Sequence, residues 1–462
     1  MAKTTKEFQR AYHALNPQQR LAVDTLDGPV MVVAGPGTGK TQTIALRIAN
    51  ILQKSDVNPD NILALTFTES GAHAMRTRLA SLIGVTAYYC HISTFHSFCI
   101  AVIQDNPDYF TLNAASEPLS DLEKLKLIYN LLDSTKLSHL RPVGAPRHYV
   151  KAILGAISDL KREGVDPIEL TSLLDTEEQY LQSDGADELK KTALSNRLRN
   201  LAKNRELAVL YELYQQQLKV SERFDFEDMI NIVTQAFQSH PELLRTYQER
   251  FQYLLVDEYQ DTNSAQNELL LTLASYWGET ANVFVTGDPD QSIMRFQGAS
   301  IENQLSFIKV YPRATVITLV QNYRSTQLIL DAADSLISHN NLRISDVVPG
   351  VNPHLTSVGT QSASSPPPIG LVQVTSATAE TIFLAQDILA KIKLGVSPSE
   401  ICIIYRTNRD AKAIIDTLIK YDIDYSVQGG ANILDDPTVR NFLKILRVIH
   451  DLRTKDDDED LF

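Results

Sequence analysis

The amino-acid sequence predicts an α/β fold built on parallel sheets, and three features of the 462-residue chain lead to this prediction. Short apolar runs recur that have the length and the β-branched content of buried strands. Segments with helical periodicity follow them, which is the alternation of parallel βαβ units. Polar motifs begin where apolar runs end, and open parallel sheets bind ligands at the carboxyl ends of their strands. We therefore expect the functional residues to gather at one edge of a sheet.

The first polar motif follows the apolar run Val30–Val33 and reads Ala34-Gly-Pro-Gly-Thr-Gly-Lys-Thr41. A strand, then a Gly-rich turn, then a helix expected over 42–52 is the order of elements in a P-loop. The backbone N–H groups of such a loop cradle phosphate oxygens. We expect Lys40 to reach the β- and γ-phosphates and Thr41 to ligate Mg²⁺. A chance Gly-rich turn is the weaker alternative, because a strand and a helix flank the loop. The candidate phosphate-binding residues are Ala34, Gly35, Pro36, Gly37, Thr38, Gly39, Lys40 and Thr41.

Composition places the chain among ordinary globular proteins of roughly two to four domains. Hydrophobic residues make up 44% of it and charged residues 21%, and the three cysteines lack the spacing of a zinc site or a disulfide framework. The net charge of −13 argues against wholesale wrapping of duplex DNA but is compatible with a local nucleic-acid groove. We see neither a signal-peptide pattern nor an apolar run of about eighteen residues, so we expect a cytoplasmic protein with no membrane span.

Residues 15–23, just ahead of the P-loop strand, predict a helix that Asn16 caps and whose first turn contains Pro17. The amide of Gln19 offers one donor and one acceptor, which suits an adenine edge. An ordinary amphipathic helix explains the segment about as well.

Residues 62–67 and 91–98 predict a second strand and a third short strand with a turn. Three side chains at these strand ends, Phe67, Phe95 and His96, are candidates for stacking on bases. Taken singly, each is more simply a core residue.

Residues 112–222 change the pattern, because strands vanish and helical periodicity dominates. Strand patterns resume afterwards, so we interpret this segment as an α-helical insertion in a first domain formed by 1–111 and 223–315. The insertion is the more basic part of the chain. Its Lys and Arg residues form either a solvated face or a nucleic-acid path.

The second decisive motif follows an apolar strand over 251–256 and begins with Asp257 and Glu258. Asp257 is a candidate for holding Mg²⁺ and Glu258 for polarising an attacking water. Two carboxylates after a strand are common by chance, but they are specific when a P-loop accompanies them. We expect the insertion to fold out so that this strand and the P-loop strand lie side by side.

Two further strands end in polar turns. The strand over 282–287 leads to Gln291, a candidate sensor of the γ-phosphate, and to Phe296, a candidate stacking residue. The strand over 314–319 leads to Arg324, which is placed to stabilise charge on a transferred phosphoryl group.

Residues 316–462 predict a second α/β domain, and we expect ATP to bind between the two domains. The Ser-, Pro- and Gly-rich segment 345–369 predicts a loop. After it we expect strands over 370–374 and 401–408 and helices over 378–394, 411–420 and 439–450.

The order and the sequences of these motifs resemble those of the UvrD/Rep family of superfamily 1 DNA helicases, over most of the chain. The family also begins its P-loop motif with Ala, as Ala34 does here. The matching stretches are 15–19 (Q-motif), 34–41 (motif I), 66–68 (Ia), 94–97 (Ib), 257–261 (II), 287–293 (III), 321–325 (IV) and 405–408, a later strand. Residues 224–228 also resemble the family's segment that returns from the helical insertion.

The resemblance implies two RecA-like domains, the second incomplete here, and a role for each matching residue. Gln19 would read the adenine, Tyr323 would stack on it, and Arg324 would contact the γ-phosphate. The catalytic residues would be Lys40, Asp257, Glu258, Gln291 and Arg324, with Thr41 and Asp257 at the metal. The single-stranded DNA contacts would be Phe67, Thr94, Phe95, His96 and Phe296.

Two departures from the family's motif sequences concern DNA contacts. Residues 69–72 read Glu-Ser-Gly-Ala where the family usually has Asn-Lys-Ala-Ala, so a Lys that would favour phosphate is missing. Met294 and Phe296 stand where the family usually has a Tyr and a Trp, so we expect stacking to survive at Phe296 and to weaken at Met294.

The activity that the resemblance implies is ATP- and Mg²⁺-dependent, 3′ to 5′ movement on single-stranded DNA and at single-strand/duplex junctions. Motifs V and VI of the family lie beyond Phe462, so we expect a C-terminally truncated chain with an incomplete catalytic cleft. Two alternatives are the helicase portion of a helicase–nuclease, and an ATP-responsive single-strand binding module that does not hydrolyse ATP.

Overall fold

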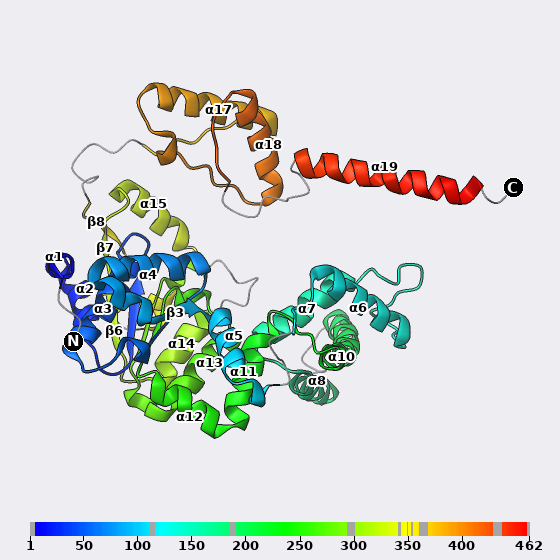
Figure 1. Cartoon of the computed structure of the whole chain (residues 1–462), viewed down its shortest axis with the longest axis horizontal. Coiled ribbons are helices and arrows are strands. Elements are labelled where there is room, and N and C mark those ends of the chain that lie inside the picture. Colours follow the sequence, from blue (N-terminus) through cyan, green and yellow to red (C-terminus); the bar gives the residue numbers. More distant parts are fainter. Residues whose placement is uncertain are drawn as a thin grey trace. The chain divides into compact units, whose positions relative to one another are not determined.

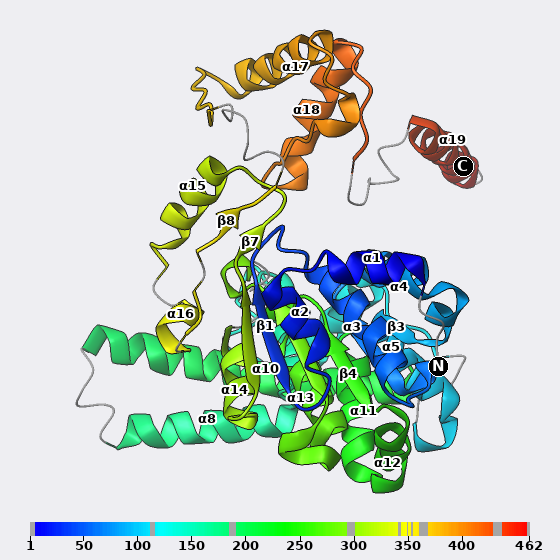
Figure 2. The same cartoon turned by 90° about the vertical axis from the view of Figure 1, so that its left-hand side faces the viewer.

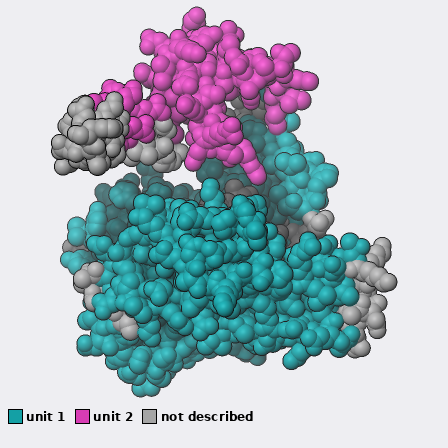
Figure 3. All heavy atoms as spheres, turned by 90° about the vertical axis from the view of Figure 1, so that its right-hand side faces the viewer, with its two compact units in different colours: residues 1–368 teal, residues 369–462 magenta. Residues whose placement is uncertain are grey.

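The computed structural model describes residues 5–110, 116–183, 191–292, 301–340, 343–348, 350–352, 354–359, 368–427 and 437–459. The chain divides into two compact units, residues 1–368 and residues 369–462, which Figure 3 colours separately.

Unit 1 is built on a six-stranded, fully parallel sheet with the order β3-β2-β4-β5-β1-β6 (Figures 1 and 2). All five residues of β1 are buried, as expected for an apolar strand that helices cover on both faces. The strands are β1 (Val30–Ala34), β2 (Ile62–Thr66), β3 (His91–Thr94), β4 (Tyr253–Val256), β5 (Val283–Gly287) and β6 (Thr315–Leu319).

Two details of the sheet differ from expectation. β5 lies between β1 and β4, so the P-loop strand and the Asp257 strand are second neighbours and not side by side. β6 pairs with β1 along its whole length, with Thr315 opposite Val30. The domain boundary expected between 315 and 316 therefore falls one residue into a strand of the first sheet. Periodicity identified these strands but carried no information on which strand pairs with which.

Alternate residues of each strand pack into two separate cores. Met31 and Val33 of β1 belong to one core, and Val30 and Val32 belong to the other, because successive side chains of a strand point to opposite faces. The first core also takes residues of α5 (Phe95–Asp105), α11 (Asp228–Ser239), α12 (Pro241–Arg250), α13 (Ser264–Ala274) and α14 (Ile301–Val310). The second takes residues of α1 (Lys6–His13), α2 (Pro17–Asp24), α3 (Lys40–Lys54) and α4 (Glu69–Ile83).

The segment between β3 and β4 contains four long helices that share a third core of their own, which includes Ile128, Ile157 and Tyr214. These helices are α6 (Asp121–Ser134), α7 (Val150–Arg162), α8 (Pro167–Gln182) and α10 (Lys191–Val220). Figure 1 shows this helical group beside the sheet of unit 1. We call it the helical insertion. The chain leaves and re-enters the sheet domain at one point, where Leu119 N donates to Phe224 O at 2.9 Å.

Beyond β6, the chain of unit 1 continues through a short two-stranded parallel pair. It consists of β7 (Gln321–Asn322) and β8 (Thr356–Ser357), with α15 (Gln327–Ile337) and α16 (Ile344–Val347) between them. The segment 345–369, expected as a loop, thus contains β8.

Unit 2 contains α17 (Ala377–Lys393), α18 (Asn408–Lys420) and α19 (Pro437–Glu459). The strands expected over 370–374 and 401–408 do not form, and the part of unit 2 that the structure describes has no strand. A strand requires a hydrogen-bonded neighbour as well as an apolar sequence. Leu371 and Ile404 are apolar residues of these segments, yet they are 98% and 92% exposed.

The described helices include none that is long and apolar enough to cross a membrane.

Candidate functional site

The loop from Ala34 to Lys40 has the backbone that phosphate binding requires. Gly37 and Gly39 have φ values of +70° and +87°, which L side chains rarely adopt. Thr38 Oγ1 donates to Gly35 O at 2.7 Å and closes the turn. Gly39 is the N-cap of α3, and no side chain in the described structure caps this helix. The first N–H groups of α3 therefore have no side-chain cap and are available to an anion, as a phosphate site requires.

Lys40 reaches across the sheet edge to the motif that follows β4. Its Nζ lies 2.9 Å from Glu258 Oε2. Glu258 has a φ of +50°, a left-handed conformation that is uncommon outside glycine and that turns the chain sharply after the strand. Gln260 Nε2 also donates to Glu258 Oε2, at 2.7 Å. A lysine and an amide thus hold one carboxylate oxygen.

Asp257 is buried at the end of β4, where its Oδ1 accepts from Glu258 N at 2.9 Å. Burial, and then the charge of Glu258, raise the pKa of Asp257 to about 7. Burial and Glu258 also raise the pKa of Asp261, to about 6, while Lys40 lowers both values. Three carboxyl groups around one lysine leave an excess of negative charge that a divalent cation would offset. The residues present therefore fit Mg²⁺, with Thr41 exposed at the start of α3.

The turn after β5 is linked to the β4 motif by a residue that the sequence reasoning did not single out. Gln260 Oε1 accepts from Asp288 N at 2.9 Å, while its Nε2 binds Glu258. Gln291 Nε2 donates to Asp288 Oδ2 at 2.6 Å, so the expected phosphate sensor is held within this turn. The feature that identifies Gln260 is the burial of its polar side chain, and burial is seen only in the structure.

The segment after β6 packs against the P-loop. Asn322 is buried, and its Nδ2 donates to Pro36 O at 2.5 Å. Its Oδ1 accepts from the N–H groups of Arg324 and Ser325, at 2.8 and 2.7 Å. Tyr323 N donates to Gly37 O at 2.9 Å. Asn322, a second residue that the sequence reasoning passed over, thus fixes the backbone of Tyr323 and Arg324 beside the P-loop.

Gln19 and Tyr323 both lie beside the P-loop and are linked to each other through Asn16. Gln19 Nε2 donates to Thr38 O at 2.8 Å, and its Oε1 accepts from Asn16 N at 3.1 Å in the capping box of α2. Asn16 Nδ2 donates to the hydroxyl of Tyr323 at 3.0 Å. Both ends of the Gln19 amide are thus bound within the chain, so reading an adenine would require Gln19 to exchange partners.

A cavity of about 170 Å³ borders the P-loop in unit 1. Its walls include Gly35 and Pro36 of the P-loop and Leu330 and Ala333 of α15. At its polar end, Arg343 Nη2 lies 2.7 Å from Asp290 Oδ2 and 3.2 Å from Asp334 Oδ1, which ties the turn containing Gln291 to α15.

The residues expected to touch DNA differ in their accessibility. Phe95 is 1% exposed and packs in the core with Phe98, so the prediction that it contacts DNA is wrong: α5 begins at this residue and turns the ring inward. Thr94 is also buried, and its Oγ1 caps α5 and donates to Glu69 Oε1 at 2.9 Å. Phe67, at the end of β2, is half-buried. Phe296 lies outside the described residues.

His96 makes a contact that the sequence reasoning missed. Its ring stacks on Phe226, with centroids 4.2 Å apart and an interplanar angle of 20°. Phe226 is 51% exposed, although the ring is large and apolar. Burial is the main reason that the pKa of His96 is lowered to about 4, so the ring is neutral at pH 7. Glu69, nearby on the same sheet edge, has a pKa lowered by Ser97 and Thr94.

This sheet order, P-loop and carboxylate pair give the chain the RecA-like fold of the P-loop NTPase class. Residues 15–312 match the family model of the UvrD/REP helicase N-terminal domain, and residues 317–457 match that of the UvrD-like helicase C-terminal domain. The chain belongs to the UvrD/REP helicase family.

The chain is also similar to individual members of that family. It is 34% identical, over 436 residues, to the ATP-dependent DNA helicase PcrA of Staphylococcus epidermidis, and 33% identical, over 436 residues, to that of Staphylococcus aureus. Each alignment covers 94% of this chain, and 54% and 53% of the relatives. The chain thus spans about half the length of the curated relatives it matches.

Proposed function

We propose that this chain is the ATP-hydrolysing part of a DNA helicase, which couples hydrolysis of Mg-ATP to 3′ to 5′ movement on single-stranded DNA. The observation that carries the proposal is the ion pair of Lys40 with Glu258, which joins the P-loop to a carboxylate at the end of β4. Family membership supports DNA as the substrate and the direction of movement.

Each group of the site has a proposed task. Lys40 exchanges Glu258 for a phosphate oxygen, and Glu258 then accepts a proton from the attacking water. Asp257 and Thr41 would hold Mg²⁺, which would neutralise charge on the phosphates. Gln291 and Arg324 respond to the γ-phosphate, and Gln19 and Tyr323 to the base. Gln260 transmits a movement of Glu258 to the turn that contains Asp288, because its side chain is hydrogen-bonded to both residues.

The proposed DNA surface consists of Phe67, His96 and Phe226. β2 and β3 are adjacent, with Thr66 opposite Thr94, so Phe67 and His96 leave the sheet at the same edge. An exposed aromatic ring supported by a neutral imidazole suits base stacking. Binding at single-strand/duplex junctions is part of the proposal.

Steady-state ATPase measurements on the 462-residue chain, with and without single-stranded DNA, test this function. We expect Lys40→Ala to abolish turnover while the thermal unfolding midpoint stays near that of the wild type. Unchanged turnover in Lys40→Ala would refute the site. ATP binding without turnover in the wild type would instead indicate an ATP-responsive binding module.

A further inference from the structure

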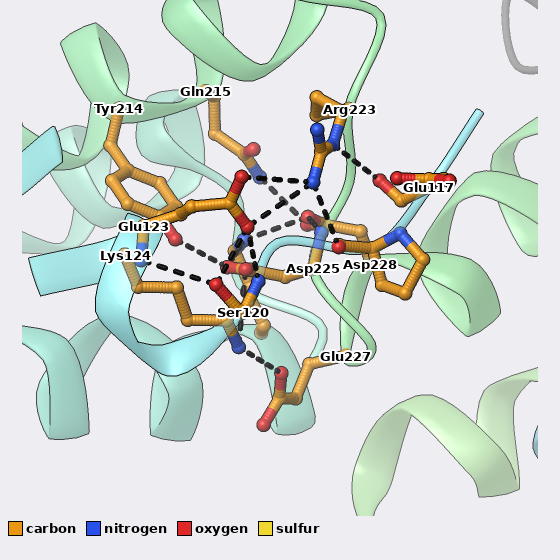
Figure 4. Close-up of polar contacts among 12 residues, drawn as sticks. Glu117, Ser120, Glu123, Lys124, Tyr214, Gln215, Arg223, Asp225, Glu227 and Asp228 are labelled. Atoms are coloured by element: carbon orange, nitrogen blue, oxygen red, sulfur yellow. Dashed lines mark hydrogen bonds and ion pairs between the residues drawn. The ribbon is translucent and has the colours of Figure 1, made fainter. Parts of the chain in front are cut away.

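A cluster of buried charges joins the helical insertion to the sheet domain (Figure 4). Lys161, near the end of α7, is fully buried. Its Nζ lies 2.7 Å from Asp225 Oδ2 and 2.8 Å from Asp228 Oδ2. Fully buried lysines are rare, since a charge is removed from water only when partners compensate it. The two carboxylates belong to the segment that leads from the insertion into α11.

Side chains from two other helices of the insertion hold the same carboxylates. The hydroxyl of Tyr214 donates to Asp225 Oδ2 at 2.8 Å, and Gln215 Nε2 donates to Asp228 Oδ1 at 3.0 Å, both from α10. Lys124 Nζ, from α6, lies 3.2 Å from Asp225 Oδ1. Figure 4 shows Tyr214, Gln215 and Lys124 pointing toward this pair of carboxylates. Burial raises the pKa of Asp225, but Lys161, Lys124 and Tyr214 together outweigh burial, so the pKa lies below its ordinary value.

Phe226 lies between the two anchored carboxylates in the sequence. Asp225 N also donates to Asp228 Oδ2 at 2.9 Å, which closes a turn around Phe226. The ring of Phe226 projects from this turn onto His96 of the sheet domain. A half-exposed aromatic side chain thus projects from a backbone segment that ion pairs from α6 and α7 and hydrogen bonds from α10 hold in place.

We propose that Lys161 is a positioning residue of the DNA surface: by binding Asp225 and Asp228 it orients the helical insertion and holds Phe226 against His96. The part of this inference that concerns DNA rests on the proposed function. Stability alone does not explain the cluster, because a buried ion pair is often no more stabilising than apolar residues of the same volume. The pair does impose one geometry, since each charge must meet its partner.

The test compares three variants of the full chain. Lys161→Met removes one charge and leaves a buried carboxylate unpaired, so it is expected to destabilise the fold. Lys161→Met combined with Asp228→Asn removes one charge of each sign, and Asp225 keeps Lys124. Arg141→Met is the control, because Arg141 forms an exposed pair with Asp133 in the same insertion, at 3.0 Å.

Two measurements are made on each folded variant. One is the dissociation constant of a fluorescently labelled oligodeoxynucleotide, with that of a fluorescent ATP analogue beside it. The other is the titration of the His96 ring by NMR. In the double variant we expect DNA affinity to fall at least tenfold, nucleotide affinity to stay within twofold, and the pKa of His96 to rise from about 4 toward its ordinary 6.5 as Phe226 leaves the ring.

A folded double variant with wild-type DNA affinity and an unchanged His96 titration would overturn the inference. Arg141→Met is expected to match the wild type in both measurements. If the wild type itself fails to bind DNA, the proposed function fails, and the His96 titration alone then decides whether Lys161 positions Phe226.

Discussion

Lys40 Nζ and Glu258 Oε2 lie 2.9 Å apart, although 218 residues separate them in the chain. The lysine side chain is 11% exposed and the glutamate side chain 40%, so the pair sits at the mouth of the site. A phosphate that binds in the P-loop must replace Glu258 as the ion-pair partner of Lys40. The same step would free the glutamate to accept a proton from water, which links binding to activation.

Glu258→Gln tests this exchange. The amide cannot take a proton from water, so we expect kcat for ATP hydrolysis to fall by about 10²-fold or more. ATP affinity should equal or exceed that of the wild type, because Lys40 no longer has to break an ion pair with a carboxylate before it binds phosphate. Turnover and the binding of a fluorescent nucleotide analogue measure the two effects. Glu279→Gln, an exposed carboxylate 4.0 Å from Arg313, serves as the control and should change neither.

Gly37→Ala tests the close approach of the P-loop to the Asn322 segment. A Cβ at Gly37 would lie 2.7 Å from Arg324 Cβ and 2.8 Å from Asn322 Nδ2, so the loop or the segment must move. Gly28→Ala is a matched control, since Gly28 has a similar φ of +76° and no atom within 4 Å of the added Cβ. Both variants should lose about 1 kcal/mol to backbone strain. Only Gly37→Ala should weaken ATP binding, by tenfold or more in titrations, and equal affinities would contradict the packing.

The strands of the first domain and the location of its site could be predicted from the sequence, because they depend on local patterns. Apolar runs with turn-forming ends specify strands, and the carboxyl ends of parallel strands coincide at one edge. The P-loop and the Asp257–Glu258 pair were therefore predicted to share an edge, and they do. The strand between them was not predicted, because strand order depends on contacts far apart in the chain.

The environment of individual side chains was the other feature that could not be predicted from the sequence. Phe95 and His96 are neighbours in the sequence, yet one lies in the core and the other stacks on Phe226. The direction of α5 decides between them, and no local pattern gives it. The same holds for Gln260 and Asn322, whose roles come from partners in other motifs. The strands expected in unit 2 failed for a related reason: apolar sequence alone does not supply a pairing partner.

Arg47→Met tests a buried arginine in the core beneath the P-loop helix. Arg47 Nη1 donates to Ala22 O at 2.7 Å and also to Thr25 O, Nη2 donates to Leu26 O at 3.2 Å, and the guanidinium lies 4.5 Å from the ring centroid of Phe284. Methionine fills part of the volume but leaves these carbonyls without donors. We expect a loss of about 3 kcal/mol in the free energy of unfolding, measured by urea denaturation. Arg20→Met removes an exposed arginine from the same region, and a comparable loss there would refute the explanation.

The stacking of His96 on Phe226 predicts a dependence of stability on pH. The pKa of His96 is lowered from 6.5 to about 4 by burial first, with Glu227 opposing and Arg162 assisting. Between these values the unfolded chain binds a proton at His96 and the folded chain does not. Stability from this group is therefore complete above pH 6.5 and is lost as pH falls toward 4, by up to about 3 kcal/mol.

Urea denaturation at pH 7.0 and pH 5.0 measures this effect as a difference between the wild type and His96→Gln. Carboxyl groups such as Asp257 and Asp261 titrate in the same range with the opposite sign, but they are common to both proteins and cancel in the difference. We expect the stability advantage of the wild type over His96→Gln to shrink by about 2 kcal/mol on going from pH 7.0 to 5.0. His139→Gln, at an exposed position of the helical insertion, should show no such change. An advantage that stays constant would mean that His96 is open to water and not covered by Phe226.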